Sequence, residues 1–156
     1  IQLRVAEIQI VSAASIPTEQ QNVGHRFPVS PEQALMRWVK DRFRLSGKRG
    51  MARFTILRAD ATETKLKKDE KLTGLFKQQA SEQYNTTVKA RLEIIDTKGI
   101  QRARFTASAS WRQNIREDTS LIDRRRIWLE LTEKLMNQFN REMDQGIQRF
   151  MAEYVF

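Results

Sequence analysis

The sequence contains no cysteine and only one histidine, His25, among its 156 residues. The absence of cysteine excludes disulfides, zinc–cysteine sites, iron–sulfur clusters and thiol nucleophiles. A single histidine excludes metal sites built from several histidines and permits at most one conventional catalytic triad. No run approaches the roughly 18 apolar residues that a membrane-crossing helix needs. We therefore expect neither a metal nor another cofactor.

The composition, 40% hydrophobic and 30% charged, is that of a soluble globular protein. The length is sufficient for one domain spanning residues 1–156, with a core that needs no disulfide. The numbering opens on Ile1 and runs at once into a strand-like segment. We expect a processed or trimmed product that a signal peptide or an anchor could have preceded.

Catalytic motifs are nearly absent. His25 lies in a loop with proline and glycine, where a surface histidine is the ordinary interpretation, and no G-x-S-x-G turn presents a serine. Ser46–Gly50 contains glycine and lysine without the spacing of a phosphate-binding loop. Nothing in the sequence pairs two of the available carboxylates, so we expect no enzymatic activity.

The net charge of +9 is unevenly distributed. Residues 120–156 carry six basic and six acidic side chains, so the whole excess lies in residues 1–119. Within residues 37–58 only Asp41 is acidic, whereas the basic residues are Arg37, Lys40, Arg42, Arg44, Lys48, Arg49, Arg53 and Arg58. Such a segment either attracts anions or is a solvated region in which cations complement a helix end.

The first half of the chain predicts a strand, a helix and a second strand. In residues 3–12 the alternation of apolar residues slips, which indicates a bulge or burial on both faces. Ser30, Pro31 and Gln33 are typical of a helix start, and Ser46–Gly47 is expected to end that helix. A strand is predicted for residues 53–66, whereas residues 67–85 fit either a long excursion or a short amphipathic helix.

The second half predicts a hairpin followed by a long helix. Residues 88–95 and 102–112 alternate strictly around a short loop that contains Gly99, so we expect two half-buried strands. Ser120 and Asp123 open a helix that keeps one apolar stripe to the end of the chain. At about 1.5 Å per residue this helix exceeds ten-residue strands, so either Gly146 breaks it or its end overhangs the sheet.

The resulting order, β-α-β-β-β-α, predicts an α+β fold, a two-layer sandwich with a mainly antiparallel four-stranded sheet and two helices on one face. The outer sheet face then carries hydroxyls and cations. We predict a site for anions or lipid headgroups formed by Arg42, Arg44, Lys48, Arg49, Arg53, Arg91, Arg102 and Arg104. Apolar side chains in a charged segment either pack on the core or mark a partner contact, and we predict a docking role for Leu72, Leu75 and Phe76.

Nucleic acid is the alternative partner for the same cations. Sheet-based RNA readers place aromatic side chains on the exposed face. Phe105 and Trp111 instead share the parity of Ala103, Ala107 and Ala109, which predicts the buried face. This pattern disfavours sequence-specific RNA recognition and leaves non-specific attraction to phosphate as the alternative.

The element order, the final helix with Trp128-Leu129-Glu130-Leu131-Thr132 and the loop Gly74-Leu75-Phe76 resemble small Gram-negative envelope lipoproteins. The pattern is similar to lipopolysaccharide-assembly (LptE-like) lipoproteins, to auxiliary lipoproteins of ABC-type transport systems and to uncharacterised alphaproteobacterial lipoproteins. The resemblance spans nearly the whole chain but has no diagnostic motif.

This resemblance implies a domain on the periplasmic side of the envelope, anchored through a lipidated cysteine that would lie upstream of Ile1. It also implies an adaptor or binding role, with a membrane protein complex or anionic lipid headgroups as partners.

Overall fold

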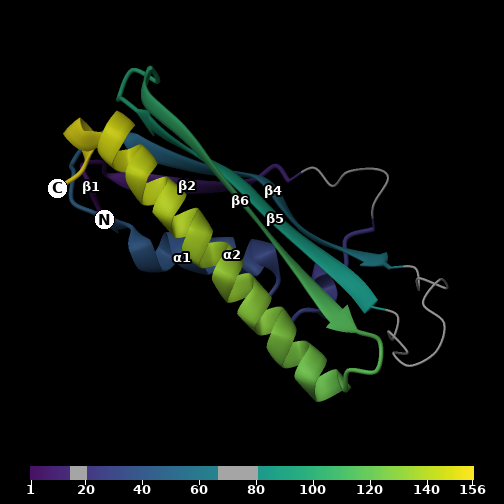
Figure 1. Ribbon diagram of the computed structural model, residues 1–156. Coiled ribbons are helices and arrows are strands. Elements are labelled where there is room, and N and C mark those ends of the chain that lie inside the picture. The colour runs from purple at the N-terminus through teal and green to yellow at the C-terminus, as the bar shows by residue number, and fades with distance from the viewer. Residues whose placement is uncertain (15–20, 67–80) are drawn as a thin grey trace.

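A computed structural model describes residues 1–14, 21–66 and 81–156. Its helices and strands follow the chain from the N-terminus to the C-terminus as shown in Figure 1. They are β1 (Gln2–Leu3), β2 (Glu7–Ser12), the 3₁₀ turn η1 (Gly24–Arg26), α1 (Pro31–Arg42), β3 (Arg44–Leu45), β4 (Met51–Lys65), β5 (Ser81–Ile95), β6 (Gln101–Arg116), α2 (Leu121–Phe150) and the 3₁₀ turn η2 (Ala152–Tyr154).

Four strands form the main sheet in the order β2-β4-β5-β6. β2 is parallel to β4, with α1 in the connection between them, and the other two pairs are antiparallel. Both helices lie on one face of this sheet (Figure 1), and one buried cluster joins Leu35 of α1, Phe54 of β4, Leu92 of β5 and Phe139 of α2. The predicted α+β sandwich is confirmed.

The first predicted strand is divided in two. β1 leaves the main sheet and pairs in parallel with β3, while β2 continues along β4. Leu3 and Val5, on either side of the end of β1, are both buried. The slip in the apolar alternation therefore marks a change of sheet.

The predicted end of the first helix is wrong. α1 begins as expected, with the Ser30 hydroxyl accepting from the Gln33 N–H, but it ends at Arg42. Phe43 is extended and packs its ring against Trp38 and Phe54. Gly47 has another role, because a Cβ there would come within 2.4 Å of the Arg4 and Val5 backbone.

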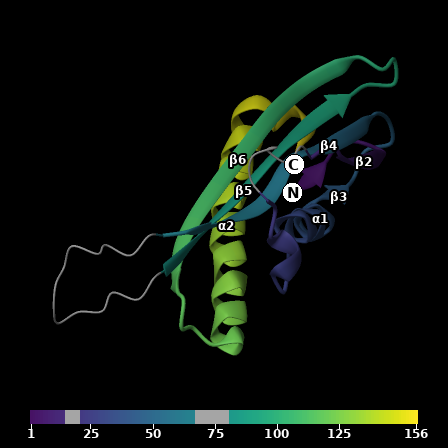
Figure 2. The ribbon, with the colours of Figure 1, turned by 90° about the vertical axis from the view of Figure 1, so that its right-hand side faces the viewer.

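The last helix neither breaks nor outgrows the sheet. α2 runs for 30 residues through Gly146, about 45 Å, and β5 and β6 have 15 and 16 residues, about 50 Å each. The strands are longer than predicted because the polar segment from Ser81 to Thr87 belongs to β5. Figure 2 shows these two long strands curving past the helices.

Candidate anion-binding surface

The main sheet has one face that points away from α1 and α2. No helix in the part of the chain that the structure describes covers this face. Strand alternation directs one set of side chains from β4, β5 and β6 toward this face. Along β6 this set is exposed, in agreement with the predicted outer face. It comprises Arg102, Arg104, Thr106, Ser108, Ser110 and Arg112.

Three arginines surround one glutamate on this face. Arg53 of β4 and Arg104 of β6 both lie directly opposite Glu93 of β5 in the strand register. Arg91 Nε lies 4.0 Å from Glu93 Oε2. We call these four residues the sheet patch. With one carboxylate for three guanidinium groups, the sheet patch retains an excess of positive charge.

The guanidinium groups of the sheet patch are only partly satisfied. Arg53 Nε donates to Gln9 Oε1 at 3.1 Å. Arg91 Nε is buried and has no hydrogen-bond partner, and Arg104 forms no ion pair with any residue that the structure describes. Lys89 of β5, two residues before Arg91 and on the same face, is exposed and lies opposite Arg58 in the strand register. Arg104 and Lys89 thus have no carboxylate partner among the described residues, and both are exposed.

Arg58 is engaged within the protein. Its Nε lies 2.5 Å from Oδ2 of Asp60, a carboxylate whose side chain is only 1% exposed. The hydrogen bond with Asp60 is the main cause of a raised pKa of the Arg58 guanidinium. This pair neutralises a buried charge and adds little to the attraction for an anion.

Two predicted site residues lie on the helix side. Arg42 donates from Nη2 to both carboxylate oxygens of Asp144, at 2.8 and 2.9 Å, and so links α1 to α2. Arg44 donates from Nη1 to the carbonyls of Lys40 and Phe43. Neither belongs to the sheet patch.

The remaining three predicted residues lie at one end of the sheet. Lys48 and Arg49 are exposed in the loop between β3 and β4, and Arg102 Nη2 lies 2.6 Å from Asp96 Oδ2. The pKa of Asp96 is lowered, chiefly by the Ile100 N–H and further by Arg102 and the Lys98 N–H. The predicted docking residues Leu72, Leu75 and Phe76 lie outside the described residues.

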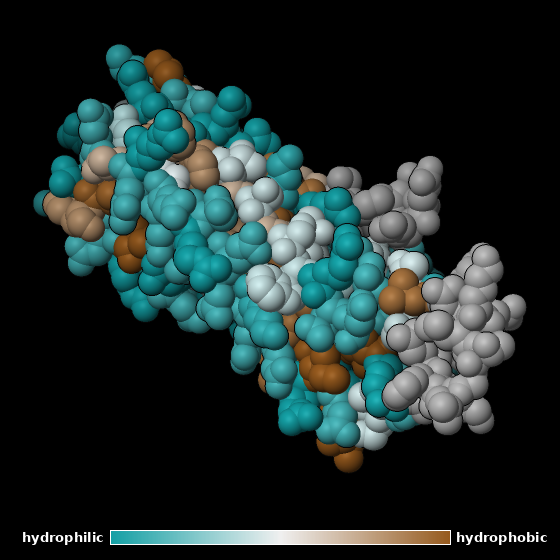
Figure 3. Space-filling model, viewed as in Figure 1, coloured by the Kyte–Doolittle hydropathy of each residue, from teal (hydrophilic) through white to brown (hydrophobic). Residues whose placement is uncertain are grey.

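Exposed apolar side chains occur at both ends of α2. In Figure 3 brown residues gather near these two ends of the molecule. The large exposed ones are Leu121, Ile122 and Leu129 near the start of α2, and Phe150 and Phe156 near the end of the chain.

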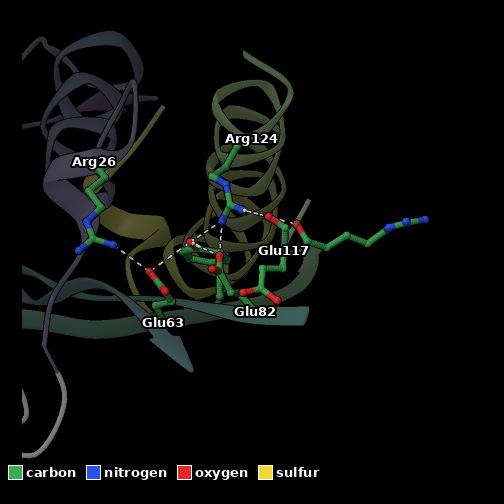
Figure 4. A network of polar contacts seen from close by, with 7 residues as sticks. Arg26, Glu63, Glu82, Glu117 and Arg124 are labelled. Atoms are coloured by element: carbon green, nitrogen blue, oxygen red, sulfur yellow. Dashed lines mark hydrogen bonds and ion pairs between the residues drawn. The ribbon is translucent and has the colours of Figure 1, made fainter. Parts of the chain in front are cut away.

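Sequence reasoning missed a polar network on the helix face (Figure 4). Arg124 of α2 contacts Glu82 and donates to the Tyr84 hydroxyl, which lies 3.0 Å from Glu82 and 3.2 Å from Glu63. Arg26 then pairs with Glu63 at 2.9 Å. Two arginines balance two glutamates, so this network neutralises itself and connects η1, β4, β5 and α2. Nothing in a single sequence pairs these residues, which lie up to 98 positions apart.

His25 is exposed beside a groove of about 420 Å³ that Ser30 and Glu32 also line. Among the residues that the structure describes, no group of three histidine, aspartate or glutamate side chains is placed to hold a metal ion. None of the helices described is both long enough and apolar enough to cross a membrane.

Comparisons with known proteins give little beyond the fold. No family model matches the chain, and no curated protein matches it. A solved structure of a minor lipoprotein from Acinetobacter baumannii is similar over 92% of both chains, with a TM-score of 0.43 and 11% identity. At this TM-score and identity the similarity assigns neither a family nor a function to this chain. It does not distinguish among the lipoprotein groups that the sequence resembles.

Proposed function

We propose that this domain is a non-enzymatic binding domain of the cell envelope that attaches to phosphate-bearing lipid headgroups through the sheet patch. The observation that carries the proposal is the cluster of Arg53, Arg91 and Arg104 around a single glutamate on an uncovered sheet face. A membrane protein complex with an acidic surface is the other partner compatible with this charge.

The expected attraction between the sheet patch and anionic lipid headgroups is electrostatic. A cation close to an anionic lipid surface contributes about 1 kcal/mol to binding, and several on one face act together. Lys89 and Arg112 extend the positive charge of the sheet patch along β5 and β6, and threonine and serine hydroxyls lie between them. A polar, basic sheet face suits headgroup contact better than insertion into the acyl region.

The position of the N-terminus is compatible with a membrane partner. Ile1 lies at the end of the molecule that also holds the β5–β6 turn and the C-terminus (Figure 1). A membrane anchor preceding Ile1 would therefore bring this basic end close to the lipid. The envelope location itself rests on the resemblance given above.

Nucleic acid is the second candidate, because the same cations would attract a phosphate backbone. Phe105 and Trp111 are partly buried and pack against the core on the helix side. The described part of the uncovered face thus offers no aromatic ring for base stacking, which favours a lipid partner over sequence-specific RNA binding.

The test is sedimentation with vesicles of phosphatidylglycerol and phosphatidylcholine, compared with phosphatidylcholine alone. The variant Arg53→Glu with Arg104→Glu should lose binding at least about tenfold, because each lost cation removes roughly 1 kcal/mol. The matched control, Arg37→Glu with Arg141→Glu, makes the same change in net charge on exposed positions of α1 and α2.

Equal binding of both double variants would contradict the proposal. Filter binding to a DNA duplex separates the alternative. Retention on DNA without binding to anionic vesicles would favour the nucleic-acid candidate.

A further inference from the structure

We propose that a small pocket at the end of the sheet, lined by Arg4, Arg49 and Arg102, binds a terminal phosphate group. The three arginines come from the β1–β2 connection, the β3–β4 loop and β6, and all three line one pocket of about 180 Å³. We call it the end pocket. It is separate from Arg53, Arg91 and Arg104, and the inference does not depend on the sheet patch.

Three arginines and one aspartate line the end pocket, so its lining has a net positive charge. Asp96 is the acidic residue in its lining, and Asp96 is already fully engaged. Its Oδ1 accepts hydrogen bonds from the N–H groups of Lys98 and Ile100 at 2.8 and 2.9 Å. Its Oδ2 accepts a hydrogen bond from Arg102 Nε and forms an ion pair with Arg102 Nη2. Arg4 and Arg49 pair with no carboxylate in the part of the chain that the structure describes. Two guanidinium groups are thus left for an incoming anion.

The guanidinium groups of Arg102 and Arg4 are held by contacts within the protein. Asp96 orients Arg102 through a hydrogen bond from Nε and an ion pair with Nη2, both at Asp96 Oδ2. The Arg4 guanidinium lies over the Phe156 ring, 3.9 Å from its centre, and the Arg4 N–H donates to the Tyr154 carbonyl at 2.9 Å. Stacking of this kind fixes the plane of a guanidinium while its edge N–H groups stay free to donate.

Backbone contacts hold the Arg49 loop against the rest of the end pocket. The Ala6 N–H donates to the Gly50 carbonyl at 3.1 Å. Gly50 has φ +72°, and a Cβ there would come within 2.9 Å of the Ile95 carbonyl oxygen. Only glycine fits this close approach without strain. The loop is therefore an ordered wall of the end pocket.

The size and lining of the end pocket select the ligand class. A volume of about 180 Å³ is below that of pockets for drug-sized molecules but admits one phosphate group. Val5, Ile94 and Ile95 form a buried apolar lining, which strengthens charge-assisted hydrogen bonds above it. An adjoining depression of about 500 Å³ shares Arg49 and Gly50 and also contains Lys48. It offers room for the organic part of a phosphate monoester.

The shared chemistry is a terminal phosphate, which either a lipid headgroup or a soluble phosphate could supply. The test is an NMR titration of the ¹⁵N-labelled protein with inorganic phosphate and, separately, with dihexanoyl phosphatidic acid below its micelle concentration. The Gly50, Thr97 and Gly99 amides report on the site, and sodium chloride at matched ionic strength is the blank.

We expect saturable shifts with phosphate. Arg4→Gln and Arg49→Gln should each weaken binding about tenfold, as expected for a lost charge-assisted hydrogen bond. Both side chains are exposed, so these variants should fold. Arg4→Lys should recover only part of the affinity, because an ammonium lacks the planar fork. The control Arg37→Gln with Arg141→Gln, at exposed positions of α1 and α2 outside both sites, should bind phosphate within about twofold of the unaltered protein.

Tighter binding of the lipid assigns a headgroup, and equal or tighter binding of inorganic phosphate assigns a soluble ligand. No shift with either probe would overturn the proposal, and so would full affinity in both Arg4→Gln and Arg49→Gln. Either of these results leaves vesicle attachment through the sheet patch standing. Conversely, phosphate binding without vesicle attachment would support the end pocket and remove the proposed function.

Discussion

At the scale of the residue, single side chains decide how closely the two layers of the molecule approach. Gly146 lies where α2 meets β6, and a Cβ there would come within 2.0 to 2.3 Å of the Phe105 ring. That ring is itself stacked on Phe150, with centroids 5.5 Å apart. The glycine therefore allows the helix to pass over a large side chain without a bend.

The first prediction concerns this contact. Gly146→Ala should lower the free energy of unfolding by about 1 kcal/mol. The steric clash of the new methyl group with Phe105 should destabilise the fold by more than the higher helix propensity of alanine stabilises it. Urea unfolding measures the change. In a double-mutant cycle, adding Phe105→Leu should remove most of the loss. A gain in stability from Gly146→Ala alone would contradict the close approach.

Tyr84 of β5 is a buried tyrosine whose surroundings change the pKa of its hydroxyl. Its side chain is 1% exposed, and its hydroxyl lies between Glu63, Glu82 and Arg124. Burial is the main cause that raises the pKa of this phenol well above its ordinary value, followed by the hydrogen bond with Glu82. Arg124 acts in the opposite direction and is outweighed.

The second prediction follows from this shift. Below pH of about 10, the usual tyrosine pKa, the phenol is neutral in both states and its contribution to stability is complete. Above that pH the unfolded chain releases the proton while the folded chain keeps it, so stability falls as pH rises. In Tyr154→Phe, where Tyr84 is the single tyrosine, phenolate absorbance should appear only well above pH 10 or on unfolding. Titration near pH 10 in the folded protein would contradict the buried network.

At the scale of the element, a relay of polar contacts joins the two helices. Trp38 Nε1 donates to Asn140 Oδ1 at 2.9 Å, and Asn140 Nδ2 donates to Asp144 at 3.0 Å. Arg42 of α1 completes the relay by donating to the carboxylate of Asp144. The rings of Trp38 and Phe139 meet edge-on beside it. This contact fixes the rotation of α1 against α2.

The third prediction tests the relay. Asn140→Leu leaves the Trp38 N–H without an acceptor and should cost about 1–2 kcal/mol in the free energy of unfolding. The matched control is Asn137→Leu, an exposed position on the same helix, which should change stability by less than about 0.5 kcal/mol. Equal losses in thermal unfolding would show that the relay is not specific.

Local sequence patterns predicted several helices and strands correctly but misplaced the end of α1. The capping residues Ser30 and Ser120 and the alternation along residues 88–112 gave the right elements, because caps and periodicity act over a few neighbouring positions. The end of α1 was placed wrongly, because the pairing of β3 with β1 depends on residues more than 40 positions away. The candidate site was predicted by residue type, but its division into the sheet patch and the end pocket was not.

At the scale of the whole molecule, charge is divided between the two faces of the sheet. On the helix side, Arg42 and Arg124 are paired with carboxylates. On the uncovered side, the sheet patch has one glutamate for three arginines. The sheet patch is thus a local excess of positive charge on the face that no described helix covers.

The fourth prediction is the salt dependence of vesicle binding. Raising the salt shortens the screening length, which is about 10 Å at 0.1 M, so binding of the unaltered protein to anionic vesicles should weaken steeply. Arg53→Glu with Arg104→Glu should bind weakly with a shallow dependence, whereas Arg37→Glu with Arg141→Glu should keep the steep one. Salt-insensitive binding of the unaltered protein would point to an apolar contact, such as Leu121 and Ile122, instead of the sheet patch.

The class of fold, the starts of both helices, the central hairpin and the excess of basic residues depend on composition and on spacing over a few positions, so they could be predicted without a structure. Three features depend on packing between distant residues and required the structure. They are the division of the first strand, the passage of α2 over Phe105 and the neutralisation of Arg42, Arg58 and Arg124 by carboxylates. The structure also placed Arg4, Arg49 and Arg102 in one pocket. The physical reason is that a cation is free or paired according to which residues, distant in sequence, the packing brings within a few ångströms of it.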